Sequence, residues 1–205
     1  MRFEYVFAAC LLGFLAPLRA STITVSGDTY ISPASPSENF GNATTLLVGD
    51  GDITLLQFDV SSLAGVSPLT QVDLEVWVTG VTDGEMIGVS QVTSAWSEST
   101  VTYNASPTLG PIVYTGTADS AGEYFTIDVT SLVQTWLAVP SSNYGFALEG
   151  MGGAVVSFAS LEDTSALHPA ELVTPQPVPE PAQTLPTAAA LAALALGFRA
   201  RRRRA

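Results

Sequence analysis

Short stretches in which strongly apolar residues alternate with others recur along the chain, and this repetition constrains the fold more than any other feature. The clearest is "QVDLEVWVTG", in which Val72, Leu74, Val76 and Val78 would point to one side of a strand and Trp77 to the other. Similar stretches, such as "ITLLQFDV", "EYFTIDV" and "GAVVSFAS", are separated by turns rich in Gly, Asp, Asn and Pro. This pattern predicts an all-β fold, an antiparallel β-sandwich resembling a jelly roll.

One stretch, "TSLVQTWLAVP" from Thr130 to Pro140, instead has apolar residues close to helical spacing. Ser131 and Gln134 have the spacing of a capping box, in which two side chains close the start of a helix. Pro140 would stop the helix. We therefore expect one short helix that closes an end of the sandwich and places Trp136 in the core.

Basic residues lie only at the two ends of the chain, because no Lys or Arg occurs between Arg19 and Arg199. Of the 19 acidic residues, all except Glu4 and Glu180 lie between Ser21 and Pro179, so 17 acids face a single His there. Such a body would repel nucleic acids, whose binding requires Lys and Arg. It would also repel anionic polysaccharides unless a divalent cation bridged the two.

Both ends have the character of sorting segments. Residues 1–20 resemble a secretory signal peptide, with Arg2 ahead of an apolar run and the small residue Ala20 at the expected cleavage site. A buried N-terminal helix and a lipoprotein signal at Cys10 are the alternatives. Near the other end, an apolar run from Thr184 to Phe198 precedes an Arg cluster that would stay cytoplasmic. We expect this helix to insert transiently in the membrane while the body is exported; a permanent anchor is the alternative.

A Pro-rich linker, residues 175–183, joins the body to this helix and contains Pro179, Glu180 and Pro181. This motif, followed by the apolar helix and the Arg cluster of residues 184–205, resembles the PEP-CTERM sorting signal of Gram-negative bacteria. The resemblance implies processing by an exosortase, after signal peptidase has acted at the other end. It also implies delivery to the outer envelope or the extracellular matrix.

The body, residues 21–174, contains five segments that resemble, in the same order, those of the DNRLRE-type β-sandwich domain, which is related to carbohydrate-binding module family 96. They are "DTYIS...ENFGNATTLLVG", "LLQFDVSSL", "VTSAWSESTVTYNASP", "FTIDVTSLVQTWL" and "VSFASLEDTSALHPAELV". The resemblance implies a β-sandwich that binds extracellular polysaccharide without catalysis. Leu161 and His168 stand where family members often carry basic residues, so binding through positive side chains is not open to this chain.

Acidic residues in the expected turns are candidate ligands for a structural Ca²⁺ ion, which takes six to eight oxygen ligands. The candidates are Asp28, Asp50, Asp52 and Glu162. Asp28 and Glu162 are the first pair to consider, because the closing strand of such a sandwich tends to return beside the first. The alternative is that these acids are solvated turn residues.

Aromatic side chains are candidate sugar contacts, because the apolar faces of sugar rings stack on them. Trp77 would face outward beside the acids of its strand, and Tyr103 is the second candidate. Packing of Trp77 beneath a loop is the alternative. Trp96, like Trp136, is expected in the core.

The sequence gives little support for catalysis. It has no G-x-S-x-G or H-E-x-x-H motif and no Gly-rich phosphate loop. We therefore predict that the protein is not an enzyme, but a secreted module that binds carbohydrate or acts in adhesion. The alternatives are a structural matrix or biofilm protein without a ligand, and a glycoside-acting enzyme that uses paired carboxylates.

Overall fold

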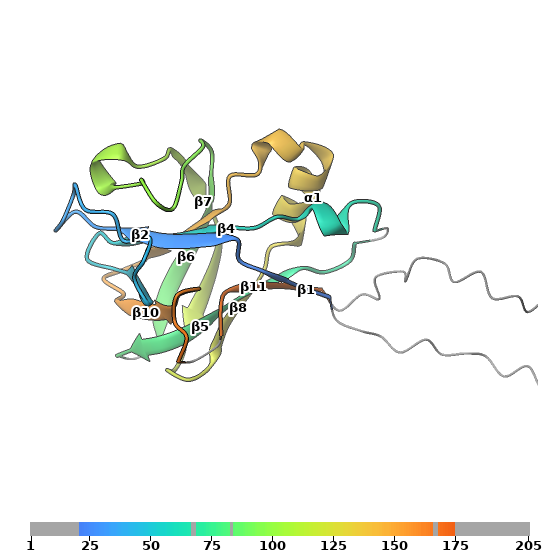
Figure 1. Cartoon of the computed structure of the whole chain (residues 1–205). Helices are drawn as coiled ribbons and strands as arrows, with labels where there is room; N and C mark the ends of the chain where they lie inside the picture. The colour runs from blue at the N-terminus through green and yellow to red at the C-terminus, as the bar shows by residue number, and fades with distance from the viewer. Residues whose placement is uncertain (1–20, 67–68, 83, 166–167, 175–205) are drawn as a thin grey trace, which may run out of the picture.

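The computed structural model describes residues 21–66, 69–82, 84–165 and 168–174. These residues form two curled antiparallel sheets and one short α-helix, as the recurring alternation predicts for an all-β sandwich (Figure 1). The expected signal helix, the linker with its sorting motif and the C-terminal apolar helix lie outside the described residues. In the part of the chain that the structure describes, no helix is both long and apolar enough to cross a membrane.

The first sheet is organised around β5 (Asp73–Val81). The first half of β5 pairs with both β8 (Tyr124–Asp128) and β11 (Glu171–Thr174), and its end pairs with β10 (Val156–Ala159). The sheet order is β1 (Ser21–Thr24), β11, β5, β10 and β3 (Thr45–Val48).

The second sheet consists of five antiparallel strands. Their order is β2 (Gly27–Ile31), β4 (Ile53–Gln57), β9 (Phe146–Gly150), β6 (Glu85–Val92) and β7 (Leu109–Ala118). β1 and β2 follow each other closely in the chain but belong to different sheets, so the segment between them crosses from one layer to the other. In the first sheet Ser21 pairs with Thr174, so the two ends of the described body lie side by side (Figure 1).

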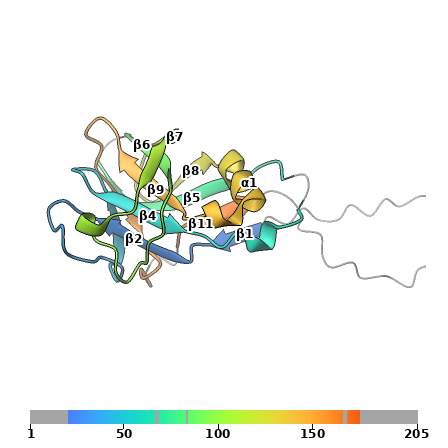
Figure 2. The same ribbon diagram turned by 90° about the horizontal axis from the view of Figure 1, so that it is seen from above.

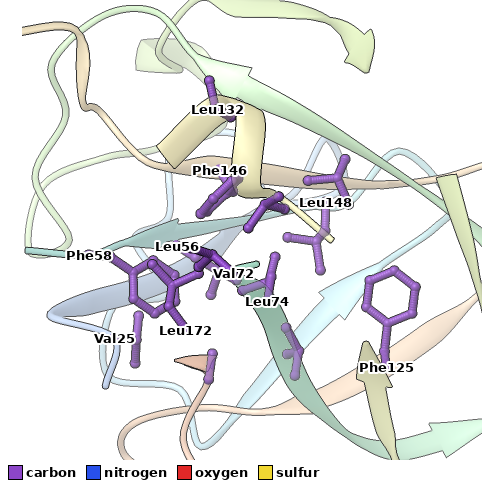
Figure 3. Packing of buried hydrophobic residues seen from close by; sticks show 14 of the residues in the cluster. Val25, Leu56, Phe58, Val72, Leu74, Phe125, Leu132, Phe146, Leu148 and Leu172 are labelled. Carbon is purple, nitrogen blue, oxygen red and sulfur yellow. The ribbon is translucent and has the colours of Figure 1, made fainter. Parts of the chain in front are cut away.

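The main hydrophobic core lies between the two sheets. The predicted inward residues are fully buried at every second position, from Val72, just before β5, to Val78, which confirms the alternation. Figure 3 shows Leu74 and Leu172 of the first sheet packed with Leu56 of the second. Burial of this apolar surface is the main force that holds the layers together.

The helix α1 (Thr130–Ala138) closes one end of the sandwich, near β1 (Figure 2). Trp136 is fully buried against Phe146, with ring centroids 4.7 Å apart, as expected for a core residue. The predicted capping box is wrong. The helix begins at Thr130, whose N–H donates to Asp128 Oδ1 at 2.9 Å, and Gln134 instead donates its amide to Leu69 O.

After the helix, Pro140–Ser142 form a 3₁₀ turn (η3), so the α-helix ends where the proline predicted. Two further 3₁₀ turns, η1 (Ser61–Leu63) and η2 (Tyr103–Ala105), lie in connections between strands. A second, smaller apolar cluster includes Leu55 and Val101 and receives the half-buried Trp96, whose Nε1–H donates to Tyr144 O. Trp96 therefore packs at the margin of the core rather than inside it.

Candidate functional site

Three carboxylates from distant parts of the chain meet at the edge of the second sheet. Asp28 lies on β2, Glu98 in the connection from β6 to β7, and Glu162 in the connection from β10 to β11. One carboxylate oxygen from each lies within 4.8 Å of the others. We call these residues the carboxylate cluster.

Each member of the cluster is held by a hydrogen bond on one of its oxygens. Asp28 Oδ2 accepts from Leu161 N at 2.8 Å, and Glu98 Oε1 accepts from the N–H of Asp28 at 2.7 Å. Glu162 Oε2 accepts from the Ser160 hydroxyl at 2.5 Å. The protein therefore orients all three carboxylates while their remaining oxygens are left for other partners.

Asp28 is the buried member, with an exposed fraction of 1%. Its Oδ1 atom is also buried and has no hydrogen-bond partner in the structure. Burial raises the pKa of Asp28 to about 7, and the negative charges of Glu162 and Glu98 act in the same direction, against hydrogen bonding with the Leu161 N–H and the Ser160 side chain. The cluster thus holds a carboxylate whose charge the surrounding protein does not compensate.

The structure brings together Asp28 and Glu162, the pair put first among the calcium candidates, and adds Glu98. From the sequence, Glu98 belongs only to the segment "VTSAWSESTVTYNASP" of the family resemblance. No local signal marks it as a partner of Asp28, because the two are 70 residues apart. Asp50 and Asp52 do not belong to the cluster.

Asp50 and Asp52 lie instead at the tight turn that leads from β3 in the first sheet to β4 in the second. Asp50 has φ 54° and Gly51 has φ 90°, which fits the two-residue turn that Asp-Gly favours. Backbone hydrogen bonds between Gly49 and Asp52 in both directions close this turn. The local role of the Asp50 backbone is therefore to shape a turn.

One side of this turn forms a shallow hollow of about 440 Å³. Tyr103, with an exposed fraction of 39%, lines it together with three carboxylate residues, Asp50, Asp52 and Glu149. The structure thus joins one predicted aromatic contact with two of the predicted calcium ligands. We call this the Tyr103 hollow.

Trp77 lies elsewhere, on the outer side of the first sheet. His168 stacks on its ring at a centroid distance of 4.1 Å, and Tyr124 of the neighbouring strand meets it edge-on at 4.9 Å. The Tyr124 hydroxyl lies 3.1 Å from His168 Nδ1. Trp77 is accordingly half-buried, and one of its faces is already covered by another ring.

Acidic residues surround this aromatic group. Glu75 of β5 lies directly opposite Glu171 of β11 in the strand register. Partial burial raises the pKa of Glu75, and the charges of Asp73 and Glu171 raise it further. Trp77 therefore does lie beside carboxylates, as its strand pattern predicted, but it does not share a surface hollow with Tyr103.

The comparison with protein families gives one result. The model of carbohydrate-binding module family 96 matches residues 19–174, which includes both sheets, the carboxylate cluster and the Tyr103 hollow. Among curated proteins, none matches the chain significantly. Because the family match spans the whole described body, the chain belongs to carbohydrate-binding module family 96.

Proposed function

We propose that the protein is an exported, non-catalytic module that binds a neutral carbohydrate in the Tyr103 hollow. The observation that carries this proposal is the exposed Tyr103 ring in a hollow lined by carboxylates, within a body that belongs to a carbohydrate-binding family. A tyrosine ring offers an apolar face to a sugar and a hydroxyl to its polar groups.

The charges around the hollow favour a neutral sugar. Asp50, Asp52 and Glu149 can accept hydrogen bonds from sugar hydroxyls, and the body carries no Lys or Arg that could attract a uronate or sulfate group. Like-charge repulsion would therefore exclude anionic polymers from this site. This differs from binding through basic side chains, for which the chain has no residues.

Trp77 is the second candidate contact and supports the proposal less well. Because His168 covers one of its faces at 4.1 Å, a sugar could stack there only if His168 moved or if the opposite face were open. Tyr124, with an exposed fraction of 36%, is the more accessible ring of that group. We therefore assign Trp77 primarily to packing the outer side of the first sheet.

The cellular setting belongs to the same proposal. The signal-peptide pattern of residues 1–20 and the motif Pro179-Glu180-Pro181, followed by an apolar run and an Arg cluster, support export and processing by signal peptidase and an exosortase. The order of segments in the body supports a DNRLRE-type domain within the family. In this proposal the mature protein acts in the outer envelope or the extracellular matrix.

The test is a glycan array probed with the purified full-length protein, followed by calorimetry on each glycan that binds. We expect neutral glycans to bind and Tyr103→Ala to weaken the binding at least tenfold, which corresponds to about 1.4 kcal/mol. Tyr124→Ala is the matched control, since it removes an equally exposed tyrosine outside the hollow. Background signal on every glycan would contradict the carbohydrate function, and would favour a structural matrix protein without a ligand.

Loss of binding in Tyr124→Ala with Tyr103→Ala unaffected would move the site to the aromatic group around Trp77. Binding of uronate polymers in preference to neutral ones would contradict the charge argument. Hydrolysis of a bound glycan, abolished by one carboxylate substitution, would show an enzyme instead.

A further inference from the structure

The Asp28 carboxylate is buried next to two other carboxylates, and one of its oxygens has no hydrogen-bond partner. It is 1% exposed, yet Oδ1 has no hydrogen-bond partner, and carboxylates of Glu98 and Glu162 lie beside it. A buried carboxylate without compensation is strongly unfavourable, so native proteins pair such groups or use them to bind metal ions.

Among the residues that the structure describes, none supplies a positive side chain for this purpose. No Lys or Arg occurs between Arg19 and Arg199, and the one histidine, His168, is engaged with Trp77 and Tyr124. The hydrogen bonds from Leu161 N and Asp28 N satisfy one oxygen each of Asp28 and Glu98 but bring no net charge. Within the described body, the compensating charge can therefore come only from a proton or from a bound cation.

We propose that the carboxylate cluster of Asp28, Glu98 and Glu162 binds one Ca²⁺ ion. The donors are all carboxylate oxygens, which are the ligands of hard cations rather than of zinc or copper. Oxygens on opposite sides of a Ca²⁺ ion are about 4.6–5.2 Å apart, and Mg²⁺ is usually bound through only one or two carboxylates. Ligand oxygens within 4.8 Å of one another therefore accommodate Ca²⁺, with water completing its shell.

The ion would connect three parts of the chain that no disulfide connects. Asp28 is 70 residues from Glu98 and 133 residues from Leu161, the neighbour of Glu162. The segment around Glu98 is held in turn by Asn39, whose side-chain amide donates to Glu98 O at 2.7 Å. Binding at the cluster would thus stabilise the native arrangement of β2 and the two long connections, independently of any sugar.

The test measures thermal unfolding of the full-length protein after removal of metal with EDTA, and again with Ca²⁺ or Mg²⁺ added. At a Ca²⁺ concentration about one hundred times the dissociation constant, we expect the melting temperature to rise by about 5–10 °C. Mg²⁺ at the same concentration should raise it much less. Calorimetric titration with Ca²⁺ should give a stoichiometry close to one.

Asp28→Asn is the decisive variant, because the amide oxygen can still accept the Leu161 N–H while the charge is removed. It should abolish the response to Ca²⁺ and, in EDTA, melt at a higher temperature than the natural protein, since like-charge repulsion is relieved. Asp50→Asn is the control; it removes an exposed acid outside the cluster and should keep the full response.

Glu162→Gln provides a second test of the cluster if Asp28→Asn does not fold, and it should weaken Ca²⁺ binding at least tenfold. An unchanged melting temperature of the natural protein in millimolar Ca²⁺, with no heat of binding, would overturn the proposal. A full Ca²⁺ response in Glu162→Gln would overturn the location, and an equal response to Mg²⁺ would overturn the choice of ion.

Discussion

Gly145, immediately before β9, is the described glycine at which an added Cβ atom would meet the shortest contact. It has φ 92°, a conformation that costs about 1–2 kcal/mol for a residue with a side chain. A Cβ atom placed on Gly145 would also lie 2.0 Å from the carbonyl oxygen of Leu56, whereas real Cβ atoms essentially never approach closer than 3.0 Å. Alanine at this position would therefore have to push β9 away from β4 by about 1 Å.

That displacement would act directly on the core. The next residue, Phe146, pairs with Leu56 in the sheet and packs against Trp136 and Phe58. Overpacking of a close-packed interior typically costs about 1–3 kcal/mol. Together with the backbone term, we expect Gly145→Ala to reduce the free energy of unfolding by about 2–5 kcal/mol.

Gly122→Ala separates the two contributions. Gly122 has φ 84°, but a Cβ atom there would meet nothing within 4 Å, so only the backbone cost of about 1–2 kcal/mol applies. The assay is urea unfolding followed by tryptophan fluorescence, which the buried Trp136 makes sensitive to loss of the core. Equal destabilisation in both variants would refute the argument that contact with Leu56 O, rather than φ alone, requires glycine at position 145.

Three further predictions concern the first sheet and the chain end. Leu74→Ala, at a fully buried position, should reduce the free energy of unfolding by about 2–5 kcal/mol; a loss below 1 kcal/mol would show that the core collapses around the gap. Glu75→Gln should raise the melting temperature at pH 7. The raised pKa of Glu75 means that its stabilising contribution, present below its unfolded-state pKa, is lost as pH rises through the higher native pKa. The gain should shrink as pH falls towards 4, and a gain that is the same at both pH values would count against repulsion from Glu171, which lies opposite. Replacing residues 179–181 by alanines should leave an unprocessed protein in the membrane fraction of its host; normal release, seen by mass spectrometry of the mature protein, would remove the exosortase assignment.

Local patterns predicted the elements of the fold well. Alternation from Val72 to Val78 correctly indicated which side of β5 is buried, and the acids Asp50 and Asp52 do lie in a turn, as expected. The predicted capping box of Ser131 and Gln134 is wrong for one local and one tertiary reason. The helix starts one residue earlier, at Thr130, whose N–H donates to the nearby Asp128 side chain. The Gln134 amide donates to Leu69 O, an acceptor distant in sequence that the spacing of a capping box cannot predict.

The carboxylate cluster, the aromatic group around Trp77 and the Tyr103 hollow each bring together residues that are far apart in the sequence. The absence of Lys and Arg between Arg19 and Arg199 followed from the sequence alone, and it argues against direct binding of anionic ligands. The meeting of Asp28 with Glu98, the stacking of His168 on Trp77, and the placement of Tyr103 beside Asp52 were decided only by the tertiary structure. Side-chain periodicity is set by the geometry of a single strand, whereas these neighbours depend on strand order and on the path of the connections, which burial of the whole core determines.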